Sequence, residues 1–444
     1  MNRKNFLSLS TGMVGAGLLA GVPKPLMAMT DFTGSSNKNN AGNITLKNVL
    51  LETGFESDEF EITATKTSLF VVEIRDGKIF SIQPNSNLKD AIDAKGYLML
   101  PAMKDMHIHL DKTFYGGPWK ARSKKQKSVV DMIKLEEKII PQLLPHSTER
   151  AEKIIELLQS HGTDFARSHC NIEPTSKLDS LKNLQQAILN KKNSFGVEIV
   201  AFPQHGLLYS RSEGLMKEAA QMDIDFIGGL DPTTIDQNMT KSMDLTIRLA
   251  LDYKKGIDIH LHESGESGLK TIEYLTELVM ENPTLKGKTF VSHAFALGRL
   301  EQPKLDQVCA NLAEAGIGII STVPIGKSVM PIPTLYKHKV KVMTGTDSVI
   351  DHWSTFGSGN MLGKANLLAQ LYGWSDELAL SRCLRIATDD ILPLDDKGEQ
   401  LWPKAGDAAN FNLFKASCSA EAVARVPQVR ARYYNGVEQK ILIS

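Results

Sequence analysis

Two histidines, one residue apart, follow an apolar run near residue 100. His107 and His109 lie in DMHIHLDKTF (105–114), shortly after GYLMLPAM (96–103). Side chains two residues apart on a strand point to the same side, so both imidazoles can reach one point beyond the strand's end. Two imidazoles that converge in this way can bind one metal ion. An isolated pair is also common as a packed part of a core, so other residues must distinguish the two interpretations.

Other apolar runs also end in histidine, glutamine or carboxylate side chains. These residues are His169 in TDFARSHC (163–170), Gln204 in VEIVAFPQ (197–204), His260 and Glu263 in IDIHLHES (257–264), His293 in KTFVSHAF (288–295) and Asp347 in VKVMTGTD (340–347). The chain has 11 histidines, and many of them lie at such ends. One histidine of this kind is most often a core residue, but several together with carboxylates indicate a metal site.

The apolar runs alternate with segments of helical periodicity, such as 149–162 and 268–282. With an opening run at 98–109 and two further runs, DFIGGLDP (225–232) and IGIISTVP (317–324), the chain offers a strand for every unit of an eight-fold βα repeat. Continuous apolar strands between helices predict a parallel sheet, and this number of units predicts an α/β fold of the (β/α)8 TIM-barrel type. A doubly wound sheet is the alternative, but no glycine-rich phosphate loop supports it.

Both ends of the chain predict short strands outside the barrel. Residues 45–100 contain alternating apolar runs joined by RDGK (75–78), and residues 401–444 contain strand-like runs with an Asn-Gly turn. Both turns are hairpin signals. We therefore expect one small β-sandwich domain built from 45–100 and 401–444, with the barrel spanning 101–400.

The barrel fold predicts where the polar residues meet. In a TIM barrel the carboxyl ends of all strands lie at one face, where active sites are found. His107, His109, His260 and Asp347 can therefore reach the same ion from different strands. Three neutral nitrogens and one carboxylate suit one divalent metal ion, Zn²⁺ or Fe²⁺. An open coordination position would hold a water molecule whose pKa the ion lowers towards neutrality.

Charge and cysteine content argue against several other functions. Lys plus Arg and Asp plus Glu both number 51, so the formal net charge is zero and gives no reason to expect a nucleic-acid partner. Cys170, Cys309, Cys383 and Cys418 lie far apart with no CxxC pair, which favours lone thiols over a zinc knuckle or a disulfide framework. We expect a small-molecule substrate as the partner and leave open whether copies associate into a homo-oligomer.

Residues 1–29 are predicted to be an export signal peptide. A basic start precedes a Gly/Ala/Leu stretch, and the small residue Ala28 offers a cleavage point. Arg3-Lys4 resembles the arginine pair of a twin-arginine signal, and a general secretory signal is the alternative. The stretch is too short and glycine-rich for a membrane span, and the polar residues 30–44 are expected to be a linker. We therefore predict a periplasmic or otherwise exported protein with no membrane span in its mature form.

Several short segments together resemble the cytosine deaminase branch of the amidohydrolase superfamily. They are HIHLD, AFPQ, HLHE, VSHA and TGTDS with DHW, and the resemblance covers nearly the whole chain after residue 45. It implies a distorted (β/α)8 barrel with a β-sandwich from both chain ends. It also implies hydrolytic deamination of an N-heterocycle by water activated on a single divalent metal. The ligands would be His107, His109, His260 and Asp347.

The resemblance implies roles for further residues. Glu263 would be the acid/base that moves a proton from water to the ring and then to the leaving amine. In the alternative interpretation, Glu263 has a structural role as an N-cap partner of the helix that follows it. His293 would orient the water and stabilise charge, and Asp347 would accept the first proton. Gln204 would read the amide edge of the ring, because an amide both donates and accepts; its alternative is a cap at the strand end. Trp353, in DHW, is expected to contact the substrate.

Some positions depart from the cytosine deaminase pattern, and these differences help to predict which ring is the substrate. Ser348 and His262 stand where that branch has acidic residues, and His205 stands where it has a glutamate. We expect Ser348 and His262 to line the substrate pocket. The patterns HLDKTF, GGLDP and HLHESGESG look nearer to a sister group of N-isopropylammelide isopropylaminohydrolase-like hydrolases, which act on s-triazine rings. The ring is therefore predicted to be cytosine-like or s-triazine-like.

Two other functions stay open beside deamination. The first is hydrolysis of an alkylamino substituent or of a cyclic amide C–N bond. Cyclic-amide hydrolysis often uses two metals bridged by a modified lysine on the fourth strand, and FIGGLDP has no lysine. The second is a non-catalytic binding protein. The complete ligand set together with Glu263 argues against it.

Overall fold

The structure is a computed structural model that describes residues 43–122, 128–325 and 329–441. The predicted export signal at 1–29 lies outside these residues, as does all of the predicted linker at 30–44 except its last two residues. Export therefore stays a prediction. Among the described helices, none combines the length and apolar composition that a membrane crossing needs.

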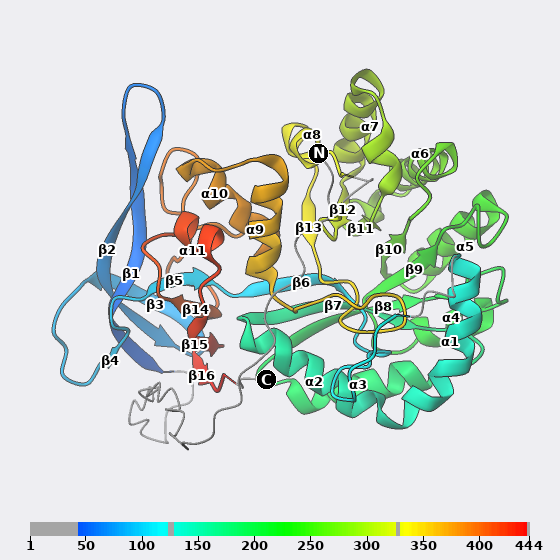
Figure 1. Cartoon of the computed structure of the whole chain (residues 1–444), viewed down its shortest axis with the longest axis horizontal. Helices are drawn as coiled ribbons and strands as arrows, with labels where there is room; N and C mark the ends of the chain where they lie inside the picture. The colour runs from blue at the N-terminus through cyan, green and yellow to red at the C-terminus, as the bar shows by residue number, and fades with distance from the viewer. Residues whose placement is uncertain (1–42, 123–127, 326–328, 442–444) are drawn as a thin grey trace, which may run out of the picture. The chain divides into compact units, whose positions relative to one another are not determined.

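One of the two sheets is the predicted eight-stranded parallel barrel (Figure 1). Its strand order is β13-β12-β11-β10-β9-β8-β7-β6. The strands are β6 (Met103–Ile108), β7 (Thr163–Asn171), β8 (Gly196–Phe202), β9 (Phe226–Leu230), β10 (Gly256–His260), β11 (Thr289–Ser292), β12 (Ile317–Ser321) and β13 (Val342–Thr344). Every residue of β9 to β13 is buried, as expected where helices cover the outside and side chains fill the inside.

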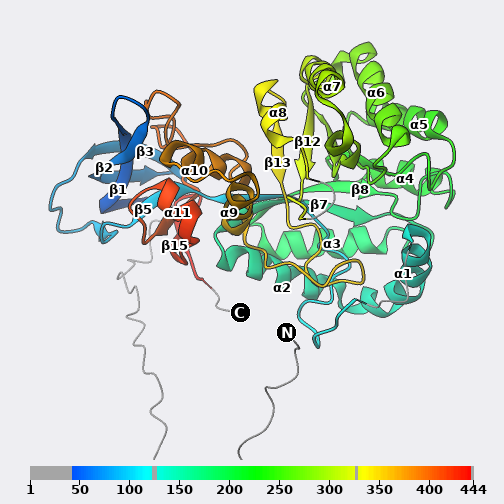
Figure 2. The ribbon, with the colours of Figure 1, turned by 45° about the horizontal axis from the view of Figure 1, so that its top comes forward.

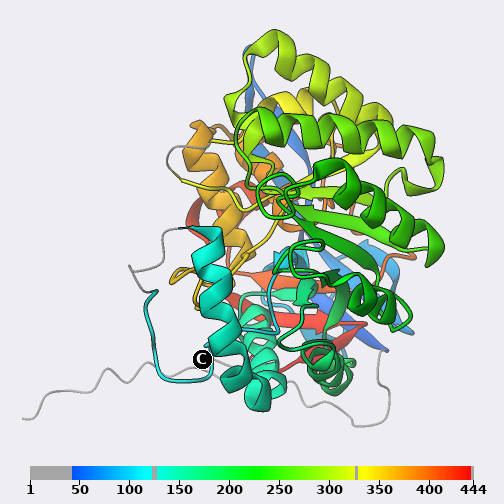
Figure 3. The same ribbon diagram turned by 90° about the vertical axis from the view of Figure 1, so that its right-hand side faces the viewer.

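Helices connect successive barrel strands and lie on their outer side (Figure 3), and two more helices follow the last strand. Their bounds are α1 (Val129–Leu143), α2 (Ser147–Ser160), α3 (Asp179–Lys191), α4 (Glu213–Ala220), α5 (Met239–Asp252), α6 (Glu266–Glu281), α7 (Gln302–Ala315), α8 (Ile332–Lys337), α9 (Met361–Tyr372) and α10 (Glu377–Cys383). In α2, Ala151, Ile154, Ile155 and Leu158 are buried at the i, i+3, i+4 and i+7 positions of one helix face. That face packs on the barrel.

The second sheet takes its strands from both ends of the described chain. They are β1 (Ile44–Ser57), β2 (Ile62–Arg75), β3 (Lys78–Pro84), β4 (Ile92–Asp93), β5 (Leu98–Pro101), β14 (Phe411–Phe414), β15 (Val429–Tyr434) and β16 (Val437–Gln439). Their order is β16-β15-β14-β5-β1-β2-β3, with β4 beside β1. A short helix, α11 (Ser419–Arg425), follows β14. Figure 2 shows α9 and α10 between this sheet and β13. The predicted separate sheet from both chain ends is thereby confirmed.

Both predicted hairpin turns form in this sheet. Asp76 and Gly77, between β2 and β3, have φ angles of 49° and 72°. Asn435 and Gly436, between β15 and β16, have φ angles of 49° and 73°. Two consecutive residues with positive φ form the tight hairpin turn that favours Asp-Gly and Asn-Gly.

The predicted first barrel strand at 98–109 is in fact two strands in different sheets. β5 pairs with β1 and β14, whereas β6 pairs with β7 in the barrel. The change occurs between two neighbours: Ala102 N donates to Asn410 O, and Met103 N donates to Gly162 O. Figure 1 shows the chain running from β5 directly into β6. The apolar run gave no sign of this change, because β5 and nearly all of β6 are buried.

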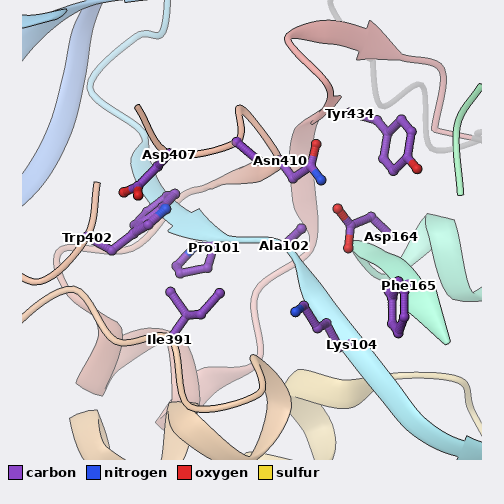
Figure 4. Close-up of a pocket in the computed structure, with 11 residues that line it drawn as sticks. Pro101, Ala102, Lys104, Asp164, Phe165, Ile391, Trp402, Asp407, Asn410 and Tyr434 are labelled. Atoms are coloured by element: carbon purple, nitrogen blue, oxygen red, sulfur yellow. The ribbon is translucent and has the colours of Figure 1, made fainter. Parts of the chain in front are cut away.

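A cavity of about 250 Å³ lies where the second sheet meets the start of the barrel strands (Figure 4). It is lined by Pro101, Ala102, Lys104, Asp164, Phe165, Ile391, Trp402, Asp407, Ala408, Asn410 and Tyr434. Asp164 is only 3% exposed, and burial raises its pKa to about 7 against the attraction of Lys104 and Arg432. Because Asp164 lies at the opposite end of β7 from His169, this cavity is separate from the histidine-rich strand ends.

We expect Asp164→Asn to stabilise the protein above pH 7 and to have little effect near pH 4. The folded carboxyl keeps its proton up to about pH 7, whereas the unfolded chain loses it near the ordinary pKa of 3.8. The folded state binds more protons in this window, so wild-type stability falls as the pH rises through it. The variant avoids this loss, which is on the order of 4 kcal/mol at most. Denaturant unfolding at both pH values measures the difference, and a pH-independent difference would contradict the raised pKa.

Candidate active site

The predicted site residues lie at or after the carboxyl ends of barrel strands. They are His107 and His109 at β6, Gln204 after β8, His260, His262 and Glu263 at β10, His293 after β11, and Asp347, Ser348 and Trp353 after β13. His262, Asp347 and Trp353 are partly exposed, and the others are buried. The group is therefore enclosed by the barrel but open to solvent at its rim.

His107, His109, His260 and Asp347 come together at this end of the barrel. His109 Nε2 lies 3.3 Å from His260 Nε2, and Asp347 Oδ1 lies 3.5 Å from the Nε2 atoms of both His107 and His109. Two ligands bound to one zinc ion at bond lengths of about 2.0–2.2 Å and tetrahedral angles lie roughly 3.3–3.6 Å apart. Each of these three separations therefore suits two ligands bound to one ion.

Hydrogen bonds at the other ring nitrogens orient two of the imidazoles. His107 Nδ1 lies 2.9 Å from Ser292 Oγ, which donates to Asp258 Oδ1 at 2.8 Å. His109 Nδ1 lies 3.1 Å from the carbonyl oxygen of His169. That carbonyl only accepts and the hydroxyl hydrogen of Ser292 is already used, so both Nδ1 atoms donate. The Nε2 lone pairs then face the shared space, and His107 Nε2 is buried with no hydrogen-bond partner among the described residues.

Burial favours the neutral form of His109, His260 and His293, and the neutral form is the one that binds a metal ion. Burial, followed by the charge of Lys112, lowers the pKa of His109 to about 4. Burial and neighbouring imidazoles hold the pKa values of His260 and His293 well below the ordinary range. Desolvation works against ionisation of Asp347, but its contacts with His107 and His109, 3.5 Å from each Nε2, hold its pKa well below the usual value. An ionised Asp347 thus lies beside imidazoles whose neutral form is favoured.

His169 belongs to the same cluster. It is fully buried, and its ligand atom lies within 4.8 Å of those of His107 and His260. Neither of its ring nitrogens has a hydrogen-bond partner in the described part of the chain. The ligand atoms of His107, His109 and Asp347 also lie within 4.8 Å of one another. His169 is therefore a further candidate ligand that the sequence did not assign to the metal.

Backbone hydrogen bonds join the first and last barrel strands at this cluster. Asp347 N donates to His107 O at 2.7 Å, and His109 N donates to Asp347 O at 3.1 Å. Gly345 makes this approach possible, because a Cβ atom there would lie 2.3 Å from His107 O. The strand closure thereby sets the relative positions of three predicted ligands.

Several residues after barrel strands have strained backbones. Asp231, His293 and Asp347 have φ angles of 37°, 69° and 66°. Positive φ is uncommon for residues other than glycine, and it persists only where the surroundings hold it. Such residues cluster at active sites, which agrees with the position of these three around the histidines.

Glu263 has one anchored carboxylate oxygen and one free oxygen. Oε1 accepts hydrogen bonds from Thr233 N at 3.0 Å, Thr234 N at 2.7 Å and Thr234 Oγ1 at 3.0 Å. Oε2 is buried and has no hydrogen-bond partner within the described ranges. The N-cap of α6 is Gly265, with no side-chain capping bond, so the alternative of Glu263 as an N-cap partner is wrong. The carboxylate is held rigidly with one oxygen available for proton transfer.

Asp231, which the sequence did not single out, organises the residues after β10. Its Oδ2 lies 2.8 Å from His262 Nδ1, and its Oδ1 accepts from His262 N at 2.6 Å and Glu263 N at 3.2 Å. Burial opposes a charge on His262, but the attraction of Asp231 raises its pKa. The rings of His262 and His293 have centroids 4.3 Å apart. The position of Asp231 directly after the apolar run FIGGL was the available signal.

Gln204 and Trp353 meet around Lys112. Lys112 Nζ donates a hydrogen bond to Gln204 Oε1 and lies 5.6 Å from the Trp353 ring centre. It also lies 5.9 Å from the centre of the Phe202 ring. Phe202 in turn stacks on His260, with ring centroids 4.0 Å apart and 16° between the planes. Lys112 and Phe202 therefore link these two predicted substrate residues to the histidine cluster.

Comparison with known proteins gives consistent matches. A model of the amidohydrolase family matches residues 151–437. An uncharacterized Escherichia coli (strain K12) protein, YahJ, is 52% identical over 446 residues, which cover 98% of this chain and 97% of YahJ. N-isopropylammelide isopropyl amidohydrolase of Pseudomonas sp. (strain ADP) is 28% identical over 69% of this chain and 77% of its own length. The crystal structure of N-isopropylammelide isopropylaminohydrolase from Burkholderia multivorans matches with a TM-score of 0.78 and 25% identity, covering 90% of this chain and 98% of that one.

Proposed function

Because the chain belongs to the amidohydrolase family and is a hydrolase of C–N bonds, we propose that it deaminates a cytosine-like or s-triazine-like ring. The family agrees with the one that its motifs indicate. The relatives from Pseudomonas and Burkholderia, both named for N-isopropylammelide, support an N-heterocyclic substrate. The reaction replaces a ring amino group with the oxygen of water and releases ammonia.

The proposal includes one divalent metal ion, Zn²⁺ or Fe²⁺. His107, His109, His260 and Asp347 would hold it, because His109 lies 3.3 Å from His260 and Asp347 lies 3.5 Å from His107 and from His109, separations that suit two ligands on one ion. When bound, such an ion acts as a Lewis acid that lowers the pKa of a water molecule towards neutrality.

The free oxygen of Glu263 is the observation that carries the proposal. Deamination needs a proton moved from the attacking water to a ring nitrogen and then to the departing amine. Glu263 Oε2 can take up and release that proton, while the bonds from Thr233 and Thr234 keep the carboxylate in place. His293 would orient the water and stabilise developing charge, and Asp347 would accept the water's first proton.

The residues around Lys112 and β13 would bind the ring. Gln204 would contact its polar edge, and Trp353 would contact its face. Ser348 and His262 would border the substituents of the ring. Since cytosine deaminases carry acidic residues at these last two positions, the substrate is expected to differ from cytosine in its substituents.

Hydrolysis of an alkylamino substituent is the second candidate. The two relatives named for N-isopropylammelide favour it. It would use the same metal ligands and Glu263, with an alkylamine as the leaving group. Cyclic-amide opening is less well supported, because β9 has no lysine to bridge a second metal.

An ammonia-release screen tests the proposal on protein reconstituted with Fe²⁺ or Zn²⁺. The panel is cytosine, 5-methylcytosine, isoguanine, creatinine, pterins, ammeline and ammelide, with a parallel chromatographic assay for alkylamines and ring-opened products. Ammonia from one ring supports deamination. An alkylamine or a ring-opened product would move the reaction to the second candidate or to cyclic-amide hydrolysis. A metal-free, folded and inactive protein would instead favour a binding protein.

A further inference from the structure

A buried arginine lies in the barrel below the histidine cluster. Arg167 belongs to β7, two residues before His169, and only 3% of it is exposed. Its Nη1 atom donates to Asp258 Oδ2 at 3.1 Å, and its Nε atom donates to Glu198 Oε2 at 2.9 Å. One guanidinium group therefore joins a carboxylate of β10 to a carboxylate of β8.

The other neighbours of this arginine are apolar. Its guanidinium carbon lies 4.0 Å from the ring centre of Phe226 and 4.3 Å from that of Phe290. Both rings belong to an apolar cluster that most of the barrel strands contribute to: Met106, Val200, Phe226, Phe290, Ile320 and Met343. Taking charges out of water is costly, and apolar side chains of similar volume often stabilise a core at least as well. Stability alone therefore gives no reason for a guanidinium group at this place.

From Asp258 a series of hydrogen bonds leads to one predicted metal ligand. Ser292 Oγ donates to Asp258 Oδ1 at 2.8 Å, and His107 Nδ1 lies 2.9 Å from Ser292 Oγ. Arginine can only donate, so Asp258 Oδ2 accepts from Arg167, and a hydroxyl that has given its one hydrogen to Oδ1 can only accept from His107. Because Asp258, Ser292 and His107 are fully buried, bulk water does not compete for these bonds. Every bond of the series thus points towards the carboxylate of Asp258.

We propose that Arg167 is a positioning residue for the metal site, which holds Asp258 so that the hydrogen of His107 stays on Nδ1 and Nε2 is free for the ion. A neutral imidazole carries its hydrogen on one nitrogen, and the other nitrogen is the one that can bind a metal. If the series ran in the opposite direction, Ser292 would donate to Nδ1 and the hydrogen would block Nε2. The inference rests on the metal site of the proposed function, but not on the identity of the ring.

The position of the hydrogen on His107 tests the proposal. The full chain is labelled with nitrogen-15 histidine and freed of metal with a chelator, and complete rebinding of Zn²⁺ shows that it stays folded. Nitrogen-15 NMR at pH 8, where an ordinary imidazole is neutral, then shows which ring nitrogen carries the hydrogen. The signal of His107 is the one that His107→Ala lacks. We expect the hydrogen on Nδ1 in the wild type, and a hydrogen on Nε2 would overturn the proposal.

Asp258→Asn keeps the size of the side chain but replaces one acceptor with a donor. Arg167 can pair only with the amide oxygen, so the amide nitrogen faces Ser292 and donates to it. The Ser292 hydroxyl is then free to donate to His107 Nδ1. We expect the hydrogen of His107 to move to Nε2 and the affinity for Zn²⁺ to fall about 10- to 100-fold. A hydrogen that stays on Nδ1 in this variant would contradict the proposal.

Arg167→Met, added to Asp258→Asn, separates the role of the arginine from that of the carboxylate. Without the guanidinium group the amide can turn its oxygen towards Ser292, so a fraction of His107 should again carry its hydrogen on Nδ1. A spectrum identical to that of Asp258→Asn alone would show that Arg167 does not set the direction of the series, and the proposal would be wrong.

Glu198→Gln is the matched control on the other side of the same guanidinium group. It makes the same change from carboxylate to amide, and its amide oxygen can still accept from Arg167 Nε. The hydrogen of His107 should therefore stay on Nδ1. A shift as large as that of Asp258→Asn would indicate a general effect of lost charge and would overturn the proposal.

The remaining outcomes separate this inference from the proposed function. If Asp258→Asn does not fold, Ser292→Ala removes the hydroxyl between Asp258 and His107 and should lower the affinity for Zn²⁺ about tenfold; an unchanged affinity overturns the proposal. Absent turnover of every ring in the panel, with the expected hydrogen positions on His107, rejects the proposed function alone. Turnover by a wild-type protein whose His107 hydrogen is on Nε2 rejects this inference alone.

Discussion

Glu263→Gln is expected to lower kcat by about 100- to 10,000-fold while the protein keeps its metal. The amide matches the carboxylate in size, and its oxygen can keep the hydrogen bonds from Thr233 and Thr234. It cannot take up and release a proton, so the transfer from water to the ring and the leaving amine is lost. The measurement is kcat of the metal-loaded variant on the ring found by the ammonia screen, with metal content determined on the same sample.

Glu266→Gln is the matched control for this prediction. Glu266 lies in the first turn of α6, is exposed, and pairs with Lys270 at 2.7 Å. The same chemical change only a few residues from Glu263 should therefore leave kcat unchanged. Nearly wild-type activity in Glu263→Gln would show that another group carries the proton, and the acid/base assignment would be wrong.

His107→Ala and His260→Ala are expected to weaken metal binding by at least about 100-fold. Even residues that only support metal ligands contribute about 10- to 100-fold to affinity, and removal of a ligand should have a larger effect. The lost imidazole also leaves a gap that water fills without the same geometry. Metal per chain, measured after dialysis against a competing chelator, tests this expectation together with the loss of turnover.

His169→Ala distinguishes the two groups of ligand atoms found in the cluster. If His107, His109, His260 and Asp347 hold the ion, His169→Ala should retain most of it. A loss as large as that of His260→Ala would place His169 among the ligands instead. His146→Ala, at an exposed position, is the control and should keep full metal content. Full metal content in both His107→Ala and His260→Ala would show that neither histidine is a metal ligand, and the proposed site would be wrong.

The main site residues could be predicted because their signals are local. The alternation of a strand places His107 and His109 on one side. The apolar runs before His260 and before Asp347 mark each of them as a strand end. The rule that parallel strands of a barrel end at one face then brings them together, although they are far apart in the chain.

The residues that support the site carry no comparable signal. Asp258 reaches His107 only through Ser292 of the neighbouring strand. Glu136 lies on a helix outside the barrel, where a carboxylate is ordinarily a solvated surface residue, yet it pairs with Lys112. Both roles depend on which elements pack together, and sequence periodicity reports only which face of an element is buried.

Residue type, spacing and periodicity were enough to predict the fold class and the candidate metal ligands, and the resemblance of short segments indicated the family and the proposed role of Glu263. Tertiary packing was needed for three other features. It set the change of sheet within 98–109, the free oxygen of Glu263, and the Gln204 atom that Lys112 occupies. Each of these depends on contacts between residues distant in the chain, and no local pattern encodes such contacts.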